Sequence, residues 1–185
     1  EVVIVGGGIW GLSTAYHLAD MGLSGVHVLE RNPIVADETT PQAAGLVGQI
    51  RSSAVMVRAI QYSLQVLTRF QDDMGYDMGL RRNGSLFVAL TPERQAAYER
   101  KAESVRAEGI RTEFPSHAAM REMAPDMDTS EIVGGLYVES DGYLDPLKCA
   151  RAYGAVAEER GATVETGTTV TVFHVEGGVL TGVET

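Results

Sequence analysis

The sequence predicts an α/β fold that begins with a parallel sheet, on two observations near the N-terminus. Val2 to Val5 form an unbroken apolar run of the kind that a strand buried on both faces requires. A glycine-rich turn, a helical pattern and a second β-rich run at Val26 to Leu29 follow it. Strand, helix and strand in this order indicate a βαβ unit, whose two strands are parallel.

The turn after the first strand carries Gly6, Gly8 and Gly11 at the spacing G-x-G-x-x-G. Gly6 permits the tight turn, Gly8 lets a pyrophosphate approach the backbone, and Gly11 lets the helix pack closely on the strand. The free N–H groups and the positive end of the helix would face the phosphates. Glu30, at the end of the second strand, is placed to accept both ribose hydroxyls. This context predicts a Rossmann-like dinucleotide site rather than a glycine turn that binds nothing.

The motif does not identify the dinucleotide. An arginine after the second strand can pair with the 2′-phosphate of NADP, and Arg31 is available for that role. Glu30 beside it would repel the same phosphate. NADP is therefore disfavoured, and FAD and NAD remain.

Composition narrows the class of protein. The 185 residues suffice for one domain, or for one domain and part of another. Fifteen basic and 25 acidic residues give a net charge of −10, which argues against binding to nucleic acid or to a membrane surface through basic residues. No apolar run reaches the roughly eighteen residues of a membrane span. The chain starts on a strand without Met and has no signal-peptide pattern, so we expect a trimmed N-terminus.

Cysteine and histidine carry no predicted chemistry. Cys149 is the only cysteine, which rules out an internal disulfide and suits a reducing, cytoplasmic location. It lies on an amphipathic helix, so we expect a buried, inert thiol. The four histidines are scattered without metal-ligand spacing, and we predict no metal site.

The middle of the chain reads as a loop, a helix and an inserted domain. Residues 32–49 lose periodicity, and their small, weakly polar composition favours a close-packed lining for a flat ligand. Apolar residues from Val57 to Met74 predict one long amphipathic helix. Residues 79–143 read as an inserted α+β domain. Its predicted elements are a strand at Ser85–Leu90, a helix from Thr91 to Glu108, a short strand at Arg111–Phe114, a short helix capped by Ser116 and a strand at Ile132–Glu139.

The last part of the chain returns to helix and strands. Asp145 and Pro146 open a helix that runs to about Arg160. Strands are predicted at Thr163–Glu165, Thr169–Val175 and Val179–Glu184. The chain ends without a closing element, so we expect it to be incomplete at its C-terminus.

Four segments in this order resemble a known family: VVIVGGGIWGLSTAYHLA…VHVLER, TTPQAAGLVGQIRSS, GYLDPLKCARAY and GATVETGTTVTVF. The chain is similar to the N-terminal part of FAD-dependent oxidoreductases of the D-amino-acid oxidase and sarcosine oxidase/dimethylglycine dehydrogenase type. The resemblance implies a Rossmann-like FAD-binding domain in two parts, residues 1–78 and 144–185, interrupted by an α+β substrate domain at 79–143. Because later strands close over the flavin in this family, we expect the isolated segment to be inactive and prone to aggregation.

The resemblance also implies roles for individual residues. Backbone groups of Ile9 and Trp10 would lie at the pyrophosphate, and the Trp10 side chain would pack under the cofactor or against the loop. Glu30 and Arg31 would lie at the adenosine, and the Val170 backbone would pair with adenine. With the three motif glycines, the remaining predicted cofactor residues are Thr39, Thr40, Gln42, Gly45 and Leu46.

The implied activity is oxidation of the C–N bond of a secondary or tertiary amine, or of an N-methylated amino acid such as sarcosine or dimethylglycine, with hydride transfer to flavin N5. Arg51 could grip a substrate carboxylate in bidentate fashion, or it could be a solvated residue at a helix start. Catalytic groups are expected beyond Thr185. An oligomer or an electron-accepting partner is compatible with this reading. The alternatives are an NAD-dependent dehydrogenase and a non-catalytic FAD-binding subunit.

The position of Gln42 bears on how the flavin is held. Some relatives tether the flavin through a histidine at the matching position. A glutamine amide nitrogen is no nucleophile, and no histidine lies between His27 and His117. We therefore predict non-covalent FAD within this segment.

Overall fold

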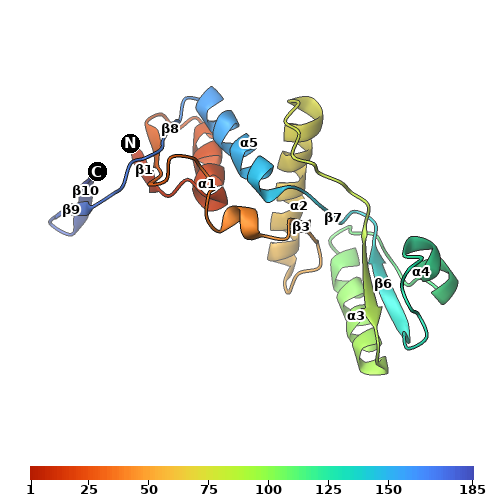
Figure 1. Cartoon of the computed structure of the whole chain (residues 1–185). Helices are drawn as coiled ribbons and strands as arrows, with labels where there is room; N and C mark the ends of the chain where they lie inside the picture. The colour runs from red at the N-terminus through yellow and green to blue at the C-terminus, as the bar shows by residue number, and fades with distance from the viewer. The chain divides into compact units, whose positions relative to one another are not determined.

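The computed structural model describes residues 1–185 and forms two compact units (Figure 1). The first unit contains residues 1–45, 76–79 and 145–185, and the second contains residues 46–75 and 80–144. The predicted boundary kept residues 46–75 with the first part of the chain. The structure groups them with the second unit, because Val57 of this stretch lies in that unit's hydrophobic core.

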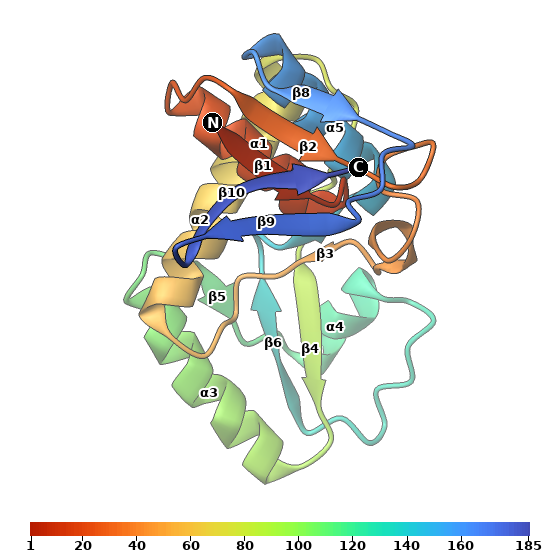
Figure 2. The same ribbon diagram turned by 90° about the vertical axis from the view of Figure 1, so that its left-hand side faces the viewer.

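The first unit is built on a parallel sheet, as the sequence predicts. Strands β1 (Val2–Val5), β2 (Val26–Leu29) and β8 (Thr163–Glu165) pair in the order β1-β2-β8. Helices α1 (Ile9–Asp20) and α5 (Pro146–Glu159) lie together behind the sheet in Figure 2. The α/β class with a parallel sheet is thus confirmed.

The contact between α1 and α5 forms the core of the first unit. Its α1 side consists of Leu12, Ala15, Tyr16 and Ala19, all buried. A Cβ atom on Gly154 of α5 would lie 3.3 Å from Leu12 Cδ2, so the glycine allows the helices to approach closely. Asp145 caps α5 by accepting hydrogen bonds from the N–H groups of Leu147 and Lys148.

Cys149 lies within this helix and is buried, as expected. Burial, together with the nearby charge of Asp145, raises the pKa of the Cys149 thiol to about 12. The thiol therefore stays protonated at neutral pH, which agrees with the prediction of an inert cysteine.

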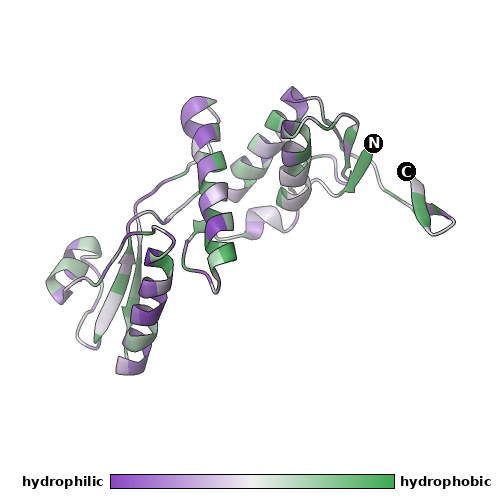
Figure 3. Ribbon diagram, turned by 180° about the vertical axis from the view of Figure 1, so that it is seen from behind, coloured by the Kyte–Doolittle hydropathy of each residue, from purple (hydrophilic) through white to green (hydrophobic).

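One face of strand β1 is more exposed to solvent than the sequence predicts. The side chains of Val3 and Val5 are 40% and 54% exposed, although the run was expected to be buried on both faces. Figure 3 shows the hydrophobic colour of this strand. β1 is the end strand of the sheet order, and the helices cover only one of its faces. An apolar run therefore did not guarantee burial on both sides.

A hairpin completes the first unit. Strands β9 (Val172–Glu176) and β10 (Val179–Glu184) pair with each other in antiparallel fashion. The predicted strand at 169–175 begins later, at Val172. The residues just before it, 167 and 168, donate their N–H groups to the carbonyls of Asn32 and Glu30.

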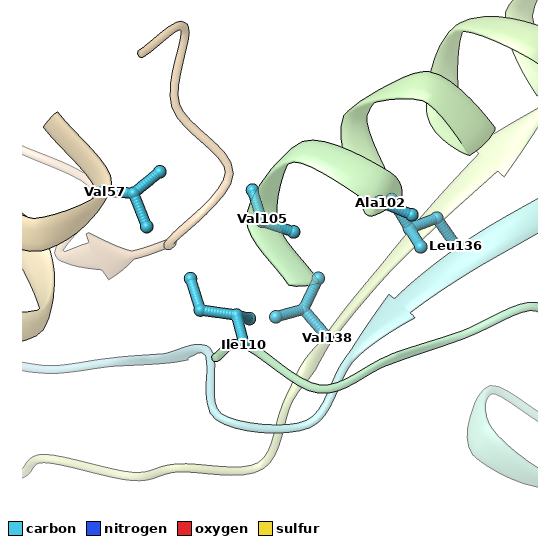
Figure 4. Close-up of a cluster of buried hydrophobic side chains, with 6 residues drawn as sticks. All are labelled: Val57, Ala102, Val105, Ile110, Leu136 and Val138. Atoms are coloured by element: carbon cyan, nitrogen blue, oxygen red, sulfur yellow. The ribbon is translucent and has the colours of Figure 1, made fainter. Parts of the chain in front are cut away.

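The second unit is an α+β structure. Strands β4 (Ser85–Ala89), β6 (Gly134–Val138) and β5 (Thr112–Glu113) form an antiparallel sheet in the order β4-β6-β5. Helices α3 (Pro92–Arg106) and α4 (His117–Met123) belong to the same unit. The short strands β3 (Leu46–Val47) and β7 (Gly142–Tyr143) pair beside them. Figure 4 shows the core, formed by Val57, Ala102, Val105, Ile110, Leu136 and Val138.

The predicted long helix of the second unit changes its hydrogen-bonding pattern part-way. Helix α2 covers Ala54–Thr68, and a π-helical turn, η2, follows at Arg69–Asp73. In this turn Met74 N–H donates to the Arg69 carbonyl at 3.1 Å. The wider turn carries Phe70, which is fully buried. Among all the helices, none is long and apolar enough to cross a membrane.

Candidate dinucleotide-binding site

The glycine turn between β1 and α1 has the geometry that the motif predicts. Gly6 has a φ of 108°, which side chains rarely tolerate. A Cβ atom on Gly11 would lie 1.9 Å from the Gly6 carbonyl oxygen, a separation that no side chain can occupy. Gly11 therefore brings the first turn of α1 directly against the end of β1.

Glu30 holds the turn from the end of β2. It is 8% exposed, and its Oε2 accepts a hydrogen bond from Gly7 N–H at 2.7 Å. Its Oε1 accepts one from Asn32 N–H at 2.8 Å. Each carboxylate oxygen can accept more than one hydrogen bond, so this arrangement leaves capacity for ribose hydroxyls.

Gly7 belongs to the hydrogen-bonded geometry of the turn, and sequence reasoning missed it. A Cβ atom there would lie 2.9 Å from Glu30 Cβ, so a side chain would push the carboxylate away from the turn. The available signal was the run of three consecutive glycines, of which the motif explains only two.

The loop after β2 folds back over the start of α1. Thr40 Oγ1 accepts a hydrogen bond from Ile9 N–H, the first N–H of the helix, at 3.2 Å. Ala36 is buried, has a φ of 57°, and donates its N–H to the Gly7 carbonyl at 3.0 Å. Sequence reasoning missed Ala36, because alanine carries no signal for a left-handed conformation.

Two adjoining clefts surround the turn and share Val5, Gly6, Glu30 and Glu38. The first, of about 280 Å³, is lined by Val5, Gly6, Gly8, Ile9, Trp10, Gly11, Glu30, Asn32, Ala36, Asp37, Glu38, Thr39 and Thr40. The second, of about 360 Å³, is lined by Val5, Gly6, Leu29, Glu30, Arg31, Glu38, Thr168, Thr169 and Val170. The structure thus brings together most of the predicted cofactor residues, including those at 31 and 170 that lie far apart in sequence.

The rim of the clefts is acidic. Arg31 Nε donates to Glu38 Oε1 at 3.2 Å, and Asn32 Nδ2 donates to the same oxygen at 3.1 Å. These hydrogen bonds hold the pKa of Glu38 below its usual value. Since Arg31 is engaged with Glu38 and lies beside Glu30, a 2′-phosphate would meet more negative than positive charge. This agrees with the expectation that NADP is disfavoured.

Three predicted residues line neither cleft. Gln42 is exposed and donates its side-chain N–H to the Glu38 carbonyl at 2.9 Å. Gly45 has a φ of 69° at the end of the loop. Leu46 is 76% exposed on β3 and belongs to the second unit. Their roles at the cofactor stay predictions.

Trp10 lines the first cleft, but its side chain is 87% exposed. The expectation that it packs against the loop is wrong. It lies in the first turn of α1, whose buried face points to α5. A position under the cofactor stays a prediction.

Arg51 lies in the second unit, just before α2. It is half-buried, and its Nη1 donates to the Ile50 carbonyl at 3.0 Å. One guanidinium nitrogen is thus engaged locally, and the choice between a carboxylate-binding and a structural role stays open.

Comparison with known proteins identifies the family. Residues 1–185 match the sequence profile of the family described as FAD dependent oxidoreductase, DAO. The chain belongs to this family. It is 35% identical over 95% of its length to human mitochondrial sarcosine dehydrogenase, of which it spans 19%. It is 31% identical over its whole length to the mitochondrial pyruvate dehydrogenase phosphatase regulatory subunit of Mus musculus, of which it spans 21%.

The chain is also similar to a bacterial oxidase subunit and to a solved structure. The chain is 30% identical over its whole length to sarcosine oxidase subunit beta of Rhizobium meliloti, and spans 45% of that protein. The crystal structure of L-proline dehydrogenase from P. horikoshii superposes with a TM-score of 0.91 and 27% identity, over 99% of this chain and 48% of that one. The chain therefore corresponds to half or less of each of these proteins.

The cofactor of the family is FAD, and the turn fits it. A Cβ atom on Gly8 would touch only Thr40 Oγ1, at the ordinary contact distance of 3.4 Å. Packing within the chain therefore tolerates a side chain at Gly8, whereas a pyrophosphate in the cleft that Gly8 lines would not. The FAD reading replaces the NAD alternative.

Proposed function

We propose that the protein is an FAD-dependent oxidoreductase that oxidises the C–N bond of a secondary or tertiary amine, or of an N-methylated amino acid such as sarcosine or dimethylglycine. The observation that carries the proposal is the 35% identity to sarcosine dehydrogenase over nearly the whole chain. The cleft around the β1–α1 turn independently supports the FAD-binding part of the proposal, because its residues suit a dinucleotide.

FAD, when bound, supplies a hydride acceptor at N5 of its flavin ring. The N–H groups at the start of α1 would face the pyrophosphate, and Glu30 would accept hydrogen bonds from the ribose. Thr40 and Ala36 hold the covering loop against this turn. We propose that the first unit binds the cofactor. The second unit contributes Arg51 to substrate binding.

A second candidate is a non-catalytic FAD-binding subunit. The observation that favours it is the 31% identity to a phosphatase regulatory subunit over the whole chain. The relative described as subunit beta of sarcosine oxidase supports a partner or an oligomer in either case. The cytoplasmic location stays a proposal that rests on the single cysteine, and the names of two of these relatives include "mitochondrial".

Reduction by substrate distinguishes the two candidates. When the full-length protein is mixed anaerobically with sarcosine or dimethylglycine, we expect its flavin absorbance to bleach, because the amine delivers a hydride to the ring. A stopped-flow or static spectrum measures this loss. Dithionite provides the control for complete reduction. A flavin that dithionite bleaches but no secondary or tertiary amine reduces would contradict the catalytic proposal and favour the subunit.

We further expect no covalent flavin bond within residues 1–185. Gln42 offers no nucleophilic nitrogen, and the Cys149 thiol is buried and stays protonated. Peptide mass spectrometry of the digested full-length protein tests this expectation. Flavin released by acid, or attached to a peptide beyond Thr185, agrees with it, whereas a flavin mass on any peptide from this segment contradicts it.

A further inference from the structure

The second unit contains a buried carboxylate that neither the fold nor the cofactor cleft explains. Asp141 lies between β6 and β7 and has no exposed surface. Burial raises the pKa of this carboxyl group, against the opposing effects of hydrogen bonds from Gln49 and Ser85 and of the charge on Arg51. A buried carboxylate is costly unless its hydrogen bonds compensate the lost hydration. Its partners therefore indicate what it does.

The hydrogen bonds of Asp141 converge on the segment that carries Arg51. Oδ1 accepts from the backbone N–H of Gln49 at 2.9 Å and from the Gln49 side-chain amide at 3.3 Å. Gln49 itself is 4% exposed, so this interaction is shielded from water. The Asp141 carbonyl also accepts from Gly84 N–H at 2.9 Å, which fixes the aspartate to the turn before β4.

Gly48 shows how close Asp141 and Arg51 lie. A Cβ atom on Gly48 would lie 3.4 Å from Asp141 Oδ2 and 3.7 Å from Arg51 Nη1. The acidic side chain of Asp141 and the basic side chain of Arg51 therefore both lie next to Gly48. Nη1 also donates to the Ile50 carbonyl, while Asp141 Oδ2 is buried without a hydrogen-bond partner.

We propose that Asp141 is a positioning residue for Arg51: it fixes segment 48–51 through Gln49 and presents the guanidinium for a substrate carboxylate. This inference rests on the proposed function for the role of Arg51, but the attachment of the segment can be measured without any substrate. Asp141 itself touches neither substrate nor cofactor in this account.

The first test measures the attachment. In full-length, FAD-loaded protein, Asp141→Ala removes Oδ1, which accepts both the backbone and one side-chain hydrogen bond of Gln49. Hydrogen exchange of peptides covering residues 46–51 should then accelerate by about tenfold, because the Gln49 N–H loses its shielded hydrogen bond. Asp128→Ala is the matched control: Asp128 Oδ1 also accepts a backbone N–H, from Ser130 at 2.9 Å, but in an exposed turn of the same unit. Unchanged exchange in residues 46–51 of folded Asp141→Ala protein would overturn the proposal.

The second test measures the consequence for Arg51. Acetate, a carboxylate that cannot be oxidised as an amine, is titrated while the flavin spectrum is followed. Asp141→Ala should weaken acetate binding by about tenfold, and should raise KM for a carboxylated amine more than it lowers kcat. On an Arg51→Gln background, the same change should have no further effect on acetate binding, because the two residues act as one unit.

Together, the two tests distinguish a positioning role of Asp141 from a purely structural one. A structural role would lower the melting temperature and leave acetate affinity as in the wild type, which would contradict the proposal. If Asp141→Ala does not fold, Asp141→Asn keeps an acceptor for Gln49 but removes the charge beside Arg51. We then expect acetate binding to weaken several-fold, and wild-type affinity would overturn the inference. Failure of every amine to bleach the flavin would refute the proposed function separately, and the exchange arm would still decide whether Asp141 holds the segment.

Discussion

Gly11→Ala should weaken FAD binding by the full-length protein more than about a hundredfold. The new Cβ atom would lie 1.9 Å from the Gly6 carbonyl oxygen and 3.1 Å from its carbonyl carbon. Both contacts are with backbone, so relief requires α1 to move away from the end of β1. That movement separates the N–H groups of the helix from the position of the pyrophosphate. We expect affinity for FAD to fall by more than about 3 kcal/mol, beyond a hundredfold.

The measurement is the FAD content of the purified variant, with titration of added FAD by fluorescence quenching. Gly182→Ala is the matched control, because a Cβ atom at that position in β10 meets no atom within 4 Å. Gly182→Ala should bind FAD like the wild type. Normal FAD affinity in Gly11→Ala would show that the turn is not the pyrophosphate site.

Glu30→Gln should weaken FAD binding by about 1–3 kcal/mol, since a charge-assisted hydrogen bond to the ribose becomes a neutral one. The structure gives a second reason for weaker FAD binding. The two carboxylate oxygens accept from the N–H groups of Gly7 and Asn32. A glutamine offers one oxygen and one NH₂ group, so one of these two N–H donors would face another donor. The turn itself would then loosen, and we expect a loss near the upper end of the range.

Isothermal titration with FAD measures this loss. Glu139→Gln provides the control: Glu139 is an exposed residue of the second unit that pairs with Arg111 at 3.3 Å and lines neither cleft of the glycine turn. It should leave the FAD dissociation constant unchanged. Equal dissociation constants for Glu30→Gln and the wild type would refute the ribose assignment.

Features with a local cause were predictable from the sequence. α5 begins after Asp145 and ends before Gly161, close to the predicted bounds, because an N-cap, a proline and a C-terminal glycine are signals within a few residues of the helix. β8 and β10 lie at the predicted residues for the same kind of reason. The glycine turn was predictable because each motif glycine meets a requirement of its own backbone.

Features that depend on distant partners were not predictable. The hydrogen bond from Gly7 to Glu30 joins residues 23 positions apart, and the one from Gln49 to Asp141 joins residues 92 positions apart. The left-handed conformation of Ala36 is held by its buried position and its hydrogen bond to Gly7. Likewise, residues 46–75 belong to the second unit, where Val57 lies in the core. Amphipathic periodicity predicts that a helix buries one face, but it does not indicate which element that face packs against.

The absorbance spectrum of the purified full-length protein tests the central claim most directly. If the β1–α1 turn and Glu30 hold FAD, the protein should be yellow, with flavin bands in the visible region and about one FAD per chain by the absorbance of the released cofactor. A colourless protein that shows no flavin bands, and that acquires none when FAD is added, would contradict the account.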